Sequence, residues 1–186
     1  APYGMKMACG ENPKRVYGTK GRMPSTRMGN LAVNRQTWIK GQEYRKKRDS
    51  GKEFTRDIGM ETLASVLDGD ILIHNHCYRA DEMALVLDMA KEFGYKVSTF
   101  HHAVESYKIA DLLRDASVCS AVWADWWGFK MEAYDAIPEN AAIIHNTGAC
   151  TIIHSDDENQ IQRLNQEAAK AQADGRRMGI NISDGE

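Results

Sequence analysis

Six histidines could supply chemistry in this chain, and all of them lie between positions 74 and 154. Most of them end or follow short runs of apolar and β-branched residues. The carboxyl ends of parallel strands meet on one face of a sheet or barrel, so side chains at successive strand ends can converge there. We therefore expect His74, His102 and Asp156 to lie close together. Two imidazoles and a carboxylate can hold a catalytic divalent metal ion while leaving one position open for water.

A single histidine at a strand end is commonly a polar residue with ordinary hydrogen-bond partners and no metal. Three successive strand ends that carry histidine nevertheless favour the metal site. His76 forms a His-x-His pair with His74. Residues two apart share one face of a strand only while the strand stays regular. His76 is therefore interpreted as a substrate contact or as support behind the metal ligands.

Alternating strands and helices are predicted to position these residues from position 70 onward. The pattern predicts strands over 70–75, 96–101, 118–124 and 150–154, and helices near 80–94, 105–113, 138–148 and 160–174. Successive strands that begin 22 to 32 residues apart indicate parallel βα units, and thus an α/β fold. Before them, residues 4–9 could form a strand, and 25–47 and 60–67 are predicted helices.

Charge and cysteine content restrict the kind of protein. The net charge is −2, but residues 1–57 hold 14 Lys and Arg against 5 Asp and Glu. These basic residues form no known nucleic-acid module, so we expect no nucleic-acid partner.

There is no run of about 18 apolar residues, and we expect no membrane span. The four cysteines lack metal-knuckle spacing, which favours reduced, buried thiols and a cytoplasmic location.

Four ordered motifs carry a resemblance to a known family. They are residues 73–83 (IHNHCYRADEM), 100–108 (FHHAVESYK), 124–130 (ADWWGFK) and 153–156 (IHSD). Together they resemble the amidohydrolase superfamily, and most of all its imidazolonepropionase-like branch. The resemblance implies a parallel (β/α)8 barrel of the TIM type. It also implies hydrolysis of carbon–nitrogen bonds in small amide, cyclic amide or dipeptide-like substrates. The attacking water would be activated by one or two divalent metal ions, which we expect to be zinc.

The resemblance also assigns roles to individual residues. His74 matches the metal-binding histidine after the fifth barrel strand, and His102 the one after the sixth. Asp156 matches the aspartate after the eighth strand, which touches metal and moves the proton. A further ligand from an earlier strand is Glu11, with Lys6 as the rival.

Three residues are candidates for substrate contact beside these ligands. Arg79 could clamp a substrate carboxylate or could form a surface ion pair. Trp126 and Lys130 belong to an aromatic loop, residues 125–130, at the same face of the sheet. That loop could contact substrate, or it could pack as core or lid.

One departure from the family pattern changes the expectation for the whole chain. Nothing before His74 supplies the His-x-His motif of the family's first strand. Residues 1–186 are therefore expected to form an incomplete barrel of about four to five βα units. Such a piece would need the remaining part of the barrel, or a homo-oligomeric partner, to cover its edges. The alternative function is a catalytically incompetent metal-binding fragment or assembly subunit.

Overall fold

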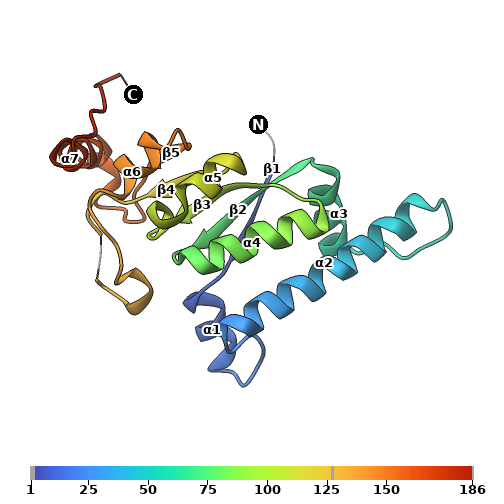
Figure 1. Ribbon diagram of the computed structural model, residues 1–186. Helices are drawn as coiled ribbons and strands as arrows, with labels where there is room; N and C mark the ends of the chain where they lie inside the picture. Colours follow the sequence, from blue (N-terminus) through green and yellow to red (C-terminus); the bar gives the residue numbers. More distant parts are fainter. Residues whose placement is uncertain (1–2, 127, 186) are drawn as a thin grey trace. The chain divides into compact units, whose positions relative to one another are not determined.

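The computed structural model describes residues 3–126 and 128–185, so Trp127 of the aromatic loop lies outside the described residues. The fold is α/β, with a parallel sheet in the order β1-β2-β3-β4-β5 (Figure 1). The strands are β1 (Tyr3–Ala8), β2 (Ile71–Cys77), β3 (Val97–His102), β4 (Cys119–Val122) and β5 (Thr151–Ile153). The α-helices are α1 (Glu11–Gly18), α2 (Arg27–Asp49), α3 (Ile58–Asp68), α4 (Ala80–Phe93), α5 (Ala110–Asp115), α6 (Asn140–Asn146) and α7 (Leu164–Arg177). Short 3-10 turns, η1 (Ser106–Ile109), η2 (Met131–Ala133) and η3 (Ile161–Arg163), join them.

The chain divides into two compact units. The first unit runs through Asn75 and includes Leu85–Ser98, and the second unit contains His76–Ala84 and the residues from Thr99 onward. β2, β3 and α4 each contribute residues to both units.

The first unit is built around the packing of α2 on α3. α2 begins where the hydroxyl of Thr26 accepts a hydrogen bond from the backbone N–H of Gly29, the usual N-cap arrangement. Its buried Trp38 stacks on Tyr95, with ring centroids 4.3 Å apart. α3 ends at Gly69, whose φ of 87° is the left-handed conformation that terminates many helices. Among the described residues no helix combines the length and the apolar character that a membrane span needs.

The second unit holds β3 from Thr99 onward, together with β4 and β5, as parallel strands, and α6 and α7 pack together (Figure 1). Its core contains Phe100, Leu113, Val122 and Ile144, all of them fully buried. The buried side chain of Asn140, at the start of α6, forms hydrogen bonds with the backbone of the turn after β3. Its amide donates to the carbonyl oxygens of residues 103 and 104, and its oxygen accepts from the N–H of residue 107.

The predicted order of strands and helices is confirmed, and the differences lie at element ends. β2 continues to Cys77, so His74 lies within this strand rather than after it. The predicted helix near 105–113 opens as the 3-10 turn η1, and α6 begins two residues after Pro138. On α4, Met83, Val86, Ala90 and Phe93 have the spacing of one helix face and are buried, whereas Leu87 is half-buried.

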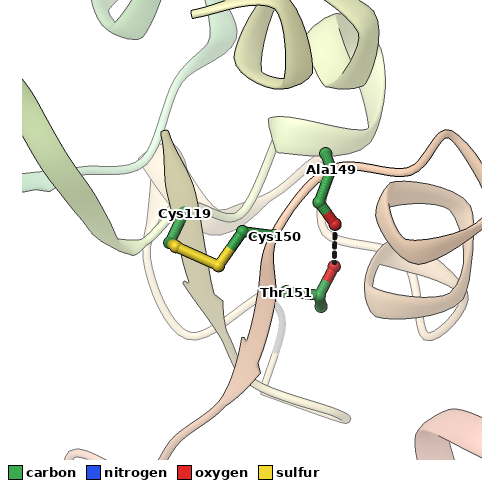
Figure 2. The surroundings of a disulfide bond; sticks show 4 residues. All are labelled: Cys119, Ala149, Cys150 and Thr151. Atoms are coloured by element: carbon green, nitrogen blue, oxygen red, sulfur yellow. Dashed lines mark hydrogen bonds between the residues drawn. A yellow bond between two sulfur atoms is a disulfide. The ribbon is translucent and has the colours of Figure 1, made fainter. Parts of the chain in front are cut away.

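The expectation of reduced cysteines is wrong. Cys119 and Cys150 form a disulfide between β4 and β5, as Figure 2 shows, and Cys9 and Cys77 are also disulfide-bonded. Among the residues that the structure describes, no cysteine is free. The register explains the pair, since Ser120 lies opposite Thr151 and the preceding residues are therefore also opposite, with Cα atoms 4.5 Å apart. Sequence spacing does not reveal this register.

Candidate active site

A histidine and an aspartate from two strand ends approach each other in the second unit. His102 is the last residue of β3 and is buried, while the side chain of Asp156, on the loop after β5, is 59% exposed. Nε2 of His102 lies 3.9 Å from Oδ2 of Asp156. The backbone of His102 has a φ of 71°, an uncommon conformation for a residue with a side chain. Strained conformations of this kind cluster at functional sites, because surrounding structure must hold them in place.

Two further imidazoles lie beside this pair. His76, the buried penultimate residue of β2, has its ring centroid 4.6 Å from that of His102. The ring of His154, next to the end of β5, lies 5.1 Å from His102. His101 is more distant, with its ring 6.4 Å from that of His102. Of the three residues expected to converge, His102 and Asp156 lie close together here, and His76 joins them from its own strand end.

Aromatic rings surround the imidazoles. Trp123, directly after β4, packs 4.8 Å from His102 and stacks on His154 at 5.7 Å. Tyr78, directly after β2, stacks on His102 at 5.4 Å and meets His76 edge-on at 5.0 Å. Sequence reasoning did not single out Tyr78 or Trp123. The available signal was their position, because each is an aromatic residue next to the carboxyl end of a predicted strand.

The residues proposed for substrate contact have partners within the second unit. Arg79 forms a two-fold ion pair with Asp81, at 2.9 and 3.1 Å, which lowers the pKa of the Asp81 carboxyl. Trp126 packs on Trp123 with centroids 5.2 Å apart. The ammonium group of Lys130 lies 3.9 Å from the centroid of the Tyr78 ring.

Two lysines form ion pairs at the start of the aromatic loop and beyond its end. Nζ of Lys170, on α7, lies 2.6 Å from a carboxylate oxygen of Asp125 and 2.7 Å from one of Glu167. After η2, Nζ of Lys108 lies 2.6 Å from Oδ2 of Asp135 and lowers the pKa of that carboxyl. An ion pair to α7 therefore holds the start of the loop, and an ion pair to η1 holds the segment that follows η2.

Three of the predicted ligand residues belong to the first unit. His74 packs against β1, where a Cβ at Gly4 would lie 3.2 Å from its ring, so a glycine there leaves room for the imidazole. Glu11 is the half-buried first residue of α1, a position where the helix dipole favours a carboxylate. Lys6 is an exposed residue of β1. The roles of these residues as metal ligands stay predictions.

The donor chemistry in the second unit suits a divalent metal. Imidazole nitrogen and carboxylate oxygen are common zinc ligands, and the 3.9 Å between Nε2 of His102 and Oδ2 of Asp156 allows one ion to reach both after a small side-chain rotation. Across residues 3–126 and 128–185, however, no three His, Cys, Asp or Glu side chains already form a group arranged to hold a metal ion.

Comparisons with known proteins point in one direction. No family model matches the chain. The amidohydrolase tasK of Hapsidospora irregularis is 28% identical over 169 residues, which cover 82% of this chain and 17% of that protein. The crystal structure of an amidohydrolase from Thermotoga maritima MSB8 superposes with a TM-score of 0.82 at 33% identity, covering 97% of this chain and 47% of that one. The chain thus spans less than half the length of either relative.

Proposed function

We propose that this chain, which is similar to two amidohydrolases, carries part of a metal-dependent hydrolase active site that acts on carbon–nitrogen bonds. Small amides, cyclic amides or dipeptide-like molecules are the proposed substrates. The observation that carries the proposal is the approach of His102 to Asp156, with His76 beside them, at the carboxyl ends of three strands. Active sites of parallel α/β folds form at this end.

His76, His102 and Asp156 are the proposed metal-binding residues of the second unit, and zinc is the proposed ion. His74 and Glu11 are further proposed ligands from the first unit. A bound zinc ion would lower the pKa of water to about 7 and polarise the scissile carbonyl group.

Asp156 has the position and exposure for proton transfer. Its carboxylate is held near His102 but stays largely exposed, so it can accept a proton from the attacking water at Oδ2 and give it to the leaving nitrogen. His102 is fixed by the positive-φ turn and by the rings of Tyr78 and Trp123, so it suits a ligand whose orientation must not change. Trp126 could form an apolar wall for the substrate.

The parallel sheet is proposed to be part of a (β/α)8 barrel. β1 and β5 stand at the two ends of the strand order, and a closed barrel would pair both of them with further strands. The remaining part of the barrel, or a second copy of the chain, would supply these strands. Both named relatives are amidohydrolases, which does not favour the alternative of an inactive metal-binding fragment.

The test joins metal analysis to an activity screen. The full-length protein is freed of metal with a chelator, titrated with zinc, and assayed against a panel of cyclic amides, acyl amides and dipeptides. We expect stoichiometric zinc binding and zinc-dependent release of amine from members of one class. Zinc binding without hydrolysis of any of these substrates would support the inactive alternative, and lack of zinc binding would refute the proposed site.

A further inference from the structure

We propose that Lys130 is a positioning residue of this site: its ammonium group fixes the ring of Tyr78, and Tyr78 in turn holds the imidazoles of His76 and His102 in the orientation that binds metal. The inference rests on the proposed function, because it concerns the same two imidazoles. It changes the interpretation of Lys130, which the sequence suggests as a substrate contact.

Contacts with Tyr78 and Glu132 hold the ammonium group of Lys130. Its Nζ lies 3.9 Å from the centroid of the Tyr78 ring, well within the range of about 6 Å for a cation–π interaction. The same atom lies 3.0 Å from Oε1 of Glu132, whose side chain is 1% exposed. A buried carboxylate is costly without a cationic partner, so Glu132 keeps the ammonium group in place. The pair also adds no net charge beside the proposed metal site.

Tyr78 connects this pair to the imidazoles. It is buried, and its ring stacks on His102 with an interplanar angle of 28°. It meets His76 and Trp123 edge-on, with centroids 5.0 and 5.7 Å away. Its backbone is fixed as well, because its carbonyl oxygen accepts a hydrogen bond from the N–H of Glu105. A shift of the Tyr78 ring would therefore disturb both imidazoles at once.

The ion pair argues against direct recognition of an anionic substrate by Lys130. Its side chain is only 22% exposed, and a substrate carboxylate would have to compete with the buried carboxylate of Glu132. Substrates of this site consequently need no negative charge at this position. Removal of Lys130 should weaken metal binding rather than raise KM selectively.

The experiment measures zinc affinity by chelator competition, together with kcat and KM, in the full-length protein. Lys130→Met removes the charge but leaves Glu132 buried and uncompensated, so the double variant Lys130→Met/Glu132→Gln is made beside it. Lys130→Arg is the conservative variant, because guanidinium also stacks on aromatic rings. Lys96→Met changes an exposed lysine and serves as the control.

We expect the double variant to bind zinc about 10-fold more weakly, within the range of about 10 to 100-fold found when residues behind metal ligands are changed. Lys130→Arg should keep most of the zinc affinity of the unmodified protein, and Lys96→Met should bind zinc as the unmodified protein does. Unchanged zinc affinity in the double variant would overturn the inference, and a selective rise in KM would then make Lys130 a substrate contact. If the unmodified protein binds no zinc, the proposed function and the positioning role of Lys130 are both refuted. Normal zinc binding in all variants refutes the positioning role alone.

Discussion

Nε2 of His102 and Oδ2 of Asp156 lie 3.9 Å apart, although the first residue ends β3 and the second lies beyond β5. The two side chains differ sharply in exposure, at 3% for His102 and 59% for Asp156. A buried imidazole that neighbouring rings hold in place suits a fixed ligand. An exposed carboxylate on a loop can rotate and exchange protons with water, which suits a group that must gain and lose a proton in each catalytic cycle.

Asp156→Asn is expected to abolish most turnover while much of the zinc stays bound. Asparagine keeps an oxygen that can coordinate a metal ion, but it cannot accept the proton of the attacking water. General acid–base assistance contributes about 10² to 10⁴-fold to rates, so the loss should fall in that range. Initial rates and metal stoichiometry of the full-length variant check this. Near-normal turnover would leave Asp156 with a structural role and make His154 or His76 the better candidate for the base.

Single alanine variants of His76 and His74 compare the two histidines of the His-x-His pair. His76 lies beside His102 in the second unit, so His76→Ala is expected to lower zinc content and activity together. His74→Ala should also lower zinc content if the imidazole after the fifth barrel strand is a ligand, as the family resemblance implies. Zinc stoichiometry after dialysis measures both. Full zinc occupancy in His76→Ala would exclude that residue as a ligand and leave it as a substrate contact.

The sequence predicts the order of βα units well, because hydrophobic periodicity is a local signal. The helix over 80–94 follows from the spacing of Met83, Val86, Ala90 and Phe93, and these side chains are buried. The end of β2 is harder to place, since β2 continues through residues 76 and 77 and the length of a strand depends on neighbouring strands that lie far away in the sequence. A prediction that stops the strand at residue 75 therefore gives His74 the strand-end position that His76 holds.

Contacts between distant residues explain the rest of what sequence reasoning missed. The ring contacts of Tyr78 and Trp123 join segments that follow β2 and β4, and no local pattern reveals them. The disulfide between Cys119 and Cys150 likewise depends on the register of β4 against β5. Both features follow from the packing of strands, which sequence spacing restricts but does not determine.

Loss of the Cys119–Cys150 disulfide is expected to destabilise the protein. The bond closes a segment with a sequence separation of 31 residues, for which the chain-entropy relation gives about 3 to 4 kcal/mol of stabilisation. The double variant Cys119→Ser/Cys150→Ser should therefore show a lower free energy of unfolding in urea. The variant retains Cys9 and Cys77, so any effect of a reductant on its free energy of unfolding comes from those two residues. Equal urea midpoints for the variant and the oxidised protein would show that the bond adds no stability.

The hydrogen bond from Tyr44 to Glu61 should make stability depend on pH in the acidic range. The hydroxyl of Tyr44 donates to Oε1 of Glu61 at 2.7 Å, and this bond, with the nearby Arg56, lowers the pKa of the Glu61 carboxyl. A carboxyl group whose pKa is lower in the folded state stabilises the protein fully above its unfolded pKa. That contribution disappears as the pH falls through the folded pKa.

Tyr44→Phe is therefore expected to raise the pKa of Glu61 toward its ordinary value and to flatten the dependence of stability on pH below about 4.5. Carboxyl chemical shifts of Glu61 followed by NMR, with urea unfolding at several pH values, measure both effects. Tyr107→Phe is the matched control, because the Tyr107 hydroxyl donates to the backbone carbonyl of Asp135 rather than to a carboxylate. This control should lose a similar amount of stability at every pH in the acidic range. If the curves of free energy against pH for Tyr44→Phe and the unmodified protein run parallel, the hydrogen bond does not set the pKa of Glu61.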